Sequence, residues 1–92
     1  QREPDAQHYL RRAIKLMADL PWLSGMSWQS SDGGGQIGDF SEYSVEIRTE
    51  SLMLKVYARH ELRPTLLLHV RLLAQLIGYF YQAKQREQRL RD

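Results

Sequence analysis

The residues best suited to chemistry gather around three consecutive glycines, Gly33–Gly35, with carboxylates on either side. A glycine-rich loop binds phosphate when a Lys and a Ser or Thr follow it and open a helix, because backbone amides then converge on the anion. Here the glycines lead toward a strand-like segment. The carboxylates of Asp32, Asp39 and Glu42 can bracket a cation only weakly, because their spacing fits no EF-hand loop. We therefore interpret residues 32–42 as a flexible connection between strands.

A second candidate is the segment His60-Glu61-Leu62-Arg63-Pro64-Thr65-Leu66. It resembles the phospho-acceptor box of sensor histidine kinases, usually His-Glu-Leu-Arg-Thr-Pro-Leu, with Thr and Pro exchanged. The resemblance implies that His60 accepts phosphate and that Glu61 polarises it. In that family the box lies inside a helix pair, whereas here it follows an alternating, strand-like segment. Because proline is typical of a first helical turn, we favour the alternative of a strand-to-helix junction with both side chains exposed.

Composition excludes several kinds of site. The 92 residues contain no cysteine, which excludes disulfides, thiolate metal sites and cysteine nucleophiles. His8 and His69 have no second ligand at a suitable spacing, so we expect no metal, no cofactor and no catalytic site. The net charge is only +2 and no basic face is evident, so we expect no nucleic-acid partner. The weak candidates for a ligand pocket are aromatic: Trp28, Tyr43 and Tyr57.

Hydrophobic periodicity predicts one small α+β domain over residues 1–92. Apolar residues recur at helical spacing over residues 5–20 and again from residue 64 to the end. Between these helices, residues 25–31, 43–50 and 52–60 alternate as strands do. We expect a three-stranded antiparallel sheet, with the N-terminal helix and the long C-terminal helix on one face. No apolar run is long enough to span a membrane.

The C-terminal helix has two apolar stripes, which is more than the domain's own core needs. The first stripe is expected to face the sheet and comprises Leu66, Val70, Leu73, Ile77 and Phe80. The second alternates spacings of four and three, as a coiled-coil seam does, through His69, Leu73, Leu76, Phe80, Ala83, Glu87 and Leu90. The second stripe predicts a homodimer.

The whole pattern resembles a reduced GAF-type sensory domain of bacterial sensor kinases. The resemblance rests on the passage from the first helix through Leu20-Pro21-Trp22-Leu23-Ser24-Gly25-Met26-Ser27-Trp28, on the strand Leu52–Tyr57, and on the closing helix. It implies a fragment of a cytoplasmic, inner-membrane-anchored kinase, with residues 81–92 beginning a signalling coiled coil. The implied role is a non-enzymatic dimerisation and relay module that acts on kinase domains of the same chain. The alternatives are a small-ligand sensor and a phospho-acceptor segment centred on His60.

Overall fold

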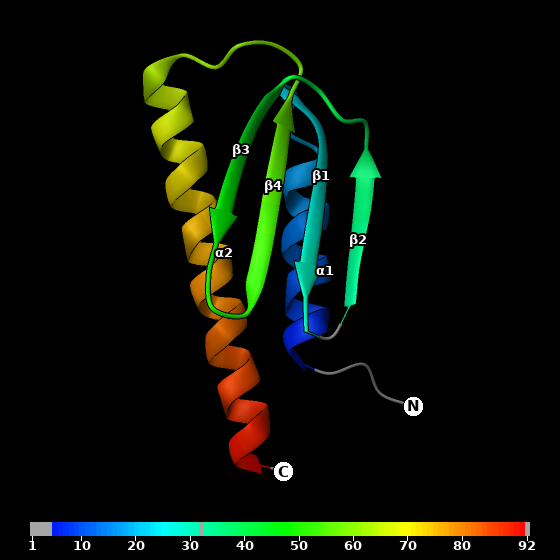
Figure 1. Cartoon of the computed structure of the whole chain (residues 1–92), viewed down its shortest axis with the longest axis vertical. Coiled ribbons are helices and arrows are strands. Elements are labelled where there is room, and N and C mark those ends of the chain that lie inside the picture. Colours follow the sequence, from blue (N-terminus) through cyan, green and yellow to red (C-terminus); the bar gives the residue numbers. More distant parts are fainter. Residues whose placement is uncertain (1–4, 32, 92) are drawn as a thin grey trace.

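The computed structural model describes residues 5–31 and 33–91, and it shows a helix, four strands and a second helix in that order (Figure 1). The elements are α1 (Asp5–Ala18), β1 (Leu23–Ser30), β2 (Gly33–Gly38), β3 (Tyr43–Arg48), β4 (Leu52–Ala58) and α2 (Pro64–Arg91). Within the described part of the chain, no helix is long and apolar enough to cross a membrane.

The sheet has four antiparallel strands in the order β2-β1-β4-β3, so the prediction of three strands was wrong. The missing strand is β2, which occupies the glycine-rich segment that we interpreted as a flexible connection. It pairs with β1 over its whole length, from Ser30 opposite Gly33 to Gly25 opposite Gly38. The indole ring of Trp28 leaves no room for a side chain at position 35 of this strand. A Cβ on Gly35 would lie 2.5 Å from Cζ2 of the ring, so glycine fits there.

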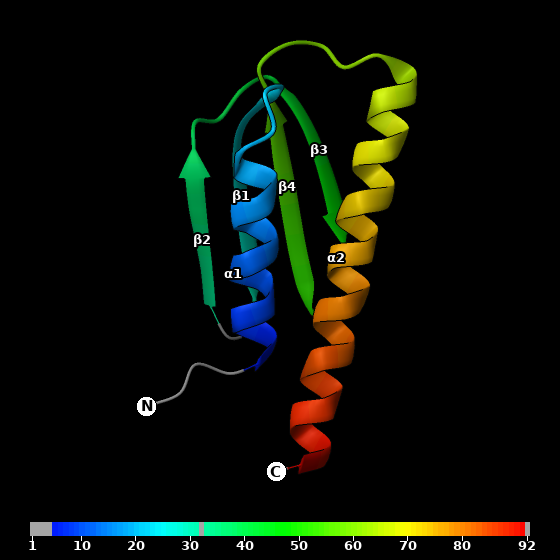
Figure 2. The ribbon, with the colours of Figure 1, turned by 180° about the vertical axis from the view of Figure 1, so that it is seen from behind.

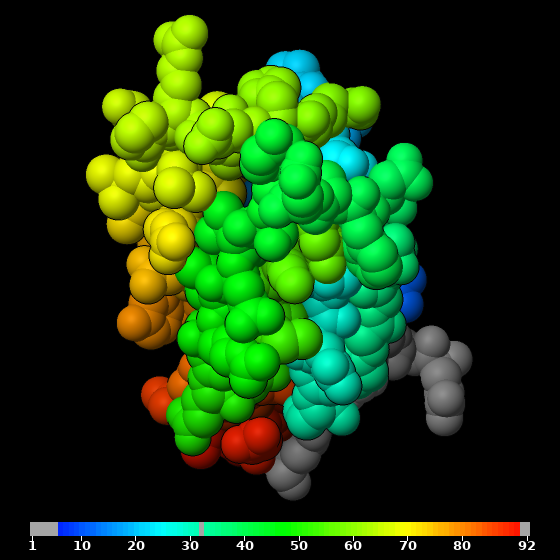
Figure 3. Space-filling model, turned by 45° about the horizontal axis from the view of Figure 1, so that its top comes forward, coloured from blue at the N-terminus to red at the C-terminus, as the bar shows by residue number. Residues whose placement is uncertain are grey.

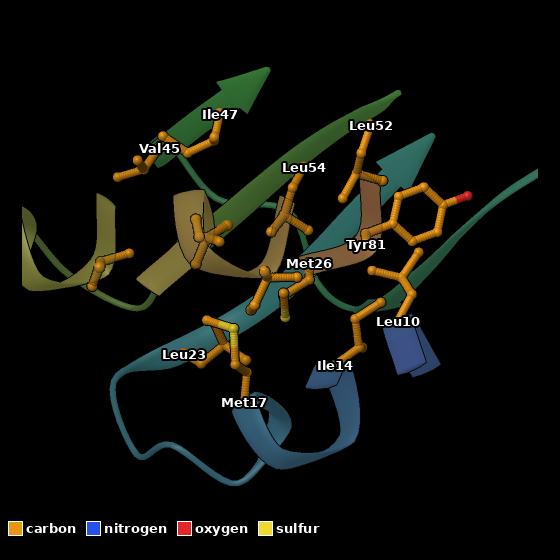
Figure 4. Close-up of a cluster of buried hydrophobic side chains, with 14 of the residues drawn as sticks. Leu10, Ile14, Met17, Leu23, Met26, Val45, Ile47, Leu52, Leu54 and Tyr81 are labelled. Carbon is orange, nitrogen blue, oxygen red and sulfur yellow. The ribbon is translucent and has the colours of Figure 1, made fainter. Parts of the chain in front are cut away.

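Both helices cover the same face of the sheet, as the sequence predicted. Figure 1 shows the sheet in front of the helices, and Figure 2 shows the helices in front of the sheet. The core fills the space between these two layers (Figure 4). Its largest fully buried side chains are Leu10, Met26, Leu54, Val56, Val70 and Tyr81.

The core stripe of α2 is rotated from the predicted one. Val70 and Ile77 are buried and Leu66 is half-buried, as expected. Leu73 and Phe80, which we assigned to both stripes, are instead 39% and 57% exposed. The core positions are taken instead by the residues that directly follow them, Ala74 and Tyr81, which the prediction omitted and which are both 0% exposed. The prediction continued the stripe from Val70 by a step of three residues, to Leu73. The buried stripe continues by a step of four, to Ala74, and both steps are compatible with a helix of 3.6 residues per turn.

Gly78 lies where the turn between β3 and β4 approaches α2. A Cβ at this position would lie 2.5 Å from Cγ2 of Thr49. The Thr49 side chain has little freedom to move aside, because its hydroxyl accepts a hydrogen bond from the backbone amide of Leu52 at 3.2 Å. Gly78 therefore permits the close contact between helix and turn.

We expect opposite effects of Gly78→Ala in two backgrounds. In the natural background the clash outweighs the helix-propensity gain, and the substitution lowers the free energy of unfolding by about 1 kcal/mol. Thr49→Ser removes the clashing methyl group and keeps the hydroxyl, so in that background Gly78→Ala raises the free energy of unfolding by up to about 1 kcal/mol. Urea unfolding of the four proteins measures both differences, and the same sign in both backgrounds contradicts this account.

Candidate functional site

The six non-acidic residues of the predicted seam on α2 are all exposed: His69, Leu73, Leu76, Phe80, Ala83 and Leu90. Leu76 is 52% exposed, Phe80 57% and Leu90 88%. Three large apolar side chains on one helix flank therefore remain in contact with water within a single chain. Scattered exposed apolar residues are ordinary, but a contiguous apolar surface is typical of an interaction site.

The apolar surface continues from α2 onto α1. Tyr9, Ala13, Leu16 and Leu20 line a groove of about 710 Å³ that also contacts Leu73 of α2. The two helices touch across this groove through the rings of Tyr9 and Phe80, whose centroids are 6.3 Å apart with an edge-on angle of 66°. We call this surface the helical apolar face; it comprises Tyr9, Ala13, Leu16, Leu20, Leu73, Leu76 and Phe80.

Sequence reasoning missed the contribution of α1 to this surface. Tyr9, Ala13 and Leu20 pack against the core but are only half-buried, and Leu16 is 77% exposed. A signal was present, because Tyr9, Ala13, Leu16 and Leu20 repeat at spacings of four, three and four, like the seam on α2. This repeat flanks the stripe Ala6, Leu10, Ile14 and Met17, whose side chains are buried in the core.

Polar groups at the rim of the helical apolar face are mainly basic. His8, Arg12 and Lys84 line the groove, and the Lys84 ammonium lies 3.5 Å from the Glu87 carboxylate. Burial raises the pKa of the Tyr9 phenol above its usual value of 10.0, so this hydroxyl stays neutral through the physiological range. The helical apolar face thus has an apolar centre and a narrow rim of polar side chains, which is the arrangement typical of protein–protein interfaces.

The aromatic candidates for a ligand pocket do not come together. Trp28 lies on the helix side of the sheet, in a groove beside α1. Tyr57 lies on the opposite face, where its ring packs against Phe40 with centroids 4.9 Å apart. Tyr43 begins the edge strand β3 and is 39% exposed. The three side chains share no cavity among those that the structure shows.

The other sequence candidates are also dispersed. His60 and Glu61 are exposed in the connection between β4 and α2, and His60 Nδ1 lies 3.2 Å from the carbonyl oxygen of Glu61. Asp39 and Glu42 are exposed, and Asp32 lies outside the described residues. Over residues 5–31 and 33–91, no three His, Cys, Asp or Glu side chains gather as a metal site requires.

Comparison with known proteins identifies no relative. The chain matches no family model, no curated protein and no solved structure. The GAF-type resemblance thus stays a prediction, and the functional argument depends on the geometry of the helical apolar face.

Proposed function

We propose that this chain is a non-enzymatic dimerisation and signal-relay module in which two copies pack through the helical apolar face. The observation that carries the proposal is that α1 and α2 each present exposed apolar side chains, side by side, beyond the residues that are buried in the core. Two such surfaces combine into a four-helix arrangement, which buries both stripes of each copy.

The length of α2 supports a second copy as the occupant. Its 28 residues make it about 42 Å long, close to the 44 Å long axis of the molecule. The seam continues along the helix to Leu90, near its end. A parallel copy related by two-fold symmetry places each seam residue beside its own counterpart, so Leu90 meets Leu90. An unlike partner would need a matching repeat of the same length.

The proposed relay works through two packings of the four helices. A change of strain or orientation at α1 shifts the population between them, and α2 transmits the difference. In this proposal the module belongs to the cytoplasmic part of a membrane-anchored bacterial histidine kinase. The GAF-like order of elements supports that placement, since a helix opens the domain and a long helix closes it.

Disulfide cross-linking tests both the dimer and its orientation. The chain has no cysteine, so a single introduced cysteine reports on one position. We expect Ala83→Cys and Leu90→Cys to form intermolecular disulfides on mild oxidation, because a parallel two-fold brings each pair of Cα atoms within about 7 Å. Arg86→Cys is the matched control, since Arg86 is exposed on the polar flank of the same helix.

The cross-linking outcomes separate the parts of the proposal. A monomeric mass by light scattering at every concentration, with no cross-linking, contradicts dimerisation. A dimer that cross-links through neither Ala83→Cys nor Leu90→Cys contradicts the parallel arrangement, and with it the relay along α2. Equal cross-linking of the Arg86→Cys control shows that the disulfides arise from random collision.

A further inference from the structure

A second surface, separate from the helical apolar face, lies at the free edge of β2. This strand pairs only with β1, so its outer backbone amides and carbonyls have no neighbouring strand. Both ribbon views show β2 at the margin of the sheet, outside α1, and it forms one margin of the sheet in the space-filling view (Figures 1, 2 and 3). Residues Gly33 to Gln36 and Gly38 are exposed, and Ile37 is half-buried.

This edge lacks the features by which proteins usually prevent edge-to-edge pairing. Protected edges carry charged residues, proline or bulges, or are covered by another element. β2 has the sequence Gly-Gly-Gly-Gln-Ile-Gly, without a charge or a proline. Its register with β1 runs without a shift. Because four of its six residues have no side chain, an approaching strand meets bare backbone.

A basic groove runs along the same edge on the helix side. It has a volume of about 660 Å³ between α1 and β2, and Trp28 forms part of its wall. Arg11, Arg12 and Lys15 of α1 line it, and no acidic side chain does so among the described residues. Arg11 already interacts with another group of the chain, whereas Arg12 and Lys15 form no ion pair within residues 5–31 and 33–91.

We propose that this edge binds an extended acidic peptide segment, which adds to the sheet as a fifth strand beside β2. Backbone hydrogen bonds to β2 supply the affinity, as in other cases of strand addition. Side chains of an added strand alternate between the two faces, so every second residue points toward the helix side. Glu or Asp at these alternate positions lies near Arg12 and Lys15, and this charge pairing selects the partner.

Charge distinguishes this partner from a second copy of the chain. Pairing β2 with β2 of another copy brings two sets of Arg12 and Lys15 to the same edge, where like charges repel. An acidic strand meets the same side chains with attraction. The groove borders the helical apolar face, because His8 and Arg12 line both, but β2 and Lys15 lie outside that face. The added strand therefore does not occupy the surface proposed for the dimer.

The probe is a synthetic peptide as long as β2 in which Glu alternates with Thr. We expect it to shift the backbone amide signals of Gly33–Gly38 in nuclear magnetic resonance spectra of the isotope-labelled chain, and to leave those of residues 72–80 in place. Two matched peptides serve as controls, one with Lys in place of each Glu and one with the same side chains but N-methylated backbone amides. Neither is expected to bind, because the first reverses the charge and the second removes the donors that pair with β2.

Two variants of the protein test separately the contribution of charge and the contribution of backbone pairing to peptide binding. Lys15 is exposed, so Lys15→Glu leaves the fold unchanged and is expected to weaken binding about tenfold, as reversal of one charge near an acidic ligand does. Gln36→Pro blocks pairing at the edge and is a second test, provided that its circular dichroism matches the natural chain.

Several results overturn the proposal. If the amide signals of Gly33–Gly38 do not shift with peptide at about 1 mM, even weak binding with a Kd of about 1 mM is excluded. Equal binding of the N-methylated peptide excludes strand addition, and equal binding of the Lys peptide excludes charge selection. Shifts at β2 that grow with protein concentration alone, without peptide, identify a second copy as the occupant instead.

Discussion

Phe80→Glu is expected to convert the dimer into a folded monomer. Phe80 is 57% exposed within one copy, so the substitution removes little from the core. In the proposed dimer one such ring from each copy becomes buried, and each ring contributes about 1–2 kcal/mol because part of it is already buried in one copy. Losing both contributions weakens association by about 30- to 10³-fold before any repulsion between the two new carboxylates is counted. Leu76→Glu is expected to act in the same way.

Light-scattering mass measures the association, and circular dichroism with thermal unfolding measures the fold. Gln75→Glu is the matched control, because Gln75 is exposed on the same helix outside the seam and acquires the same charge. It is expected to remain a dimer. If Phe80→Glu stays dimeric, the interface lies elsewhere. If it unfolds, Phe80 belongs to the core after all.

Tyr81→Ala is expected to cause the largest loss of stability in the chain. Tyr81 is 0% exposed, and its hydroxyl accepts hydrogen bonds from the side-chain amides of Gln7 and Gln85, each at 3.1 Å. Truncating a large buried aromatic side chain to alanine costs about 3–5 kcal/mol. A domain of this length has a total free energy of unfolding of roughly 5–14 kcal/mol, so between about a fifth and all of it is lost.

Urea unfolding of Tyr81→Ala measures this loss, with Tyr79→Ala as the matched control. Tyr79→Ala is the same substitution two positions away, but the Tyr79 side chain is 65% exposed. Its substitution is expected to change the free energy of unfolding by no more than about 0.5 kcal/mol. All proteins are compared at one concentration, because dimerisation adds to apparent stability. A similar loss in both variants contradicts the assignment of Tyr81 to the core.

Much of the fold was predictable because its elements follow strong periodic patterns. Both helices and the β3–β4 hairpin were expected close to their observed bounds, and so was the placement of both helices on one face. The strand β2 was not, because glycine carries no side-chain pattern and the contact of Gly35 with Trp28 of β1 exists only in the folded sheet. That contact is a tertiary one, which local sequence rules do not contain.

The helical apolar face was predictable only in part. The exposure of Leu76, Phe80 and Leu90 agrees with the stripe that sequence reasoning assigned to the seam. The share of α1 was missed because its two apolar stripes are adjacent and were not told apart in the sequence. Leu16 lies six positions after Leu10, about 120° away around the helix, and it is exposed whereas Leu10 is buried. Which part of the helix the sheet covers is decided by packing of the complete domain.

The first turn of α1 and the last turns of α2 are tied together. The backbone amide of Ala6 donates a 2.6 Å hydrogen bond to the side-chain oxygen of Gln88, 82 positions away in the sequence. Both helix ends therefore lie at the same end of the molecule (Figure 2). Under the proposed relay, a torque applied to the start of α1 would reach the end of α2 directly, without passing through the sheet. The input and the output of that relay would then lie at the same end of the domain, while the sheet holds both helices in place.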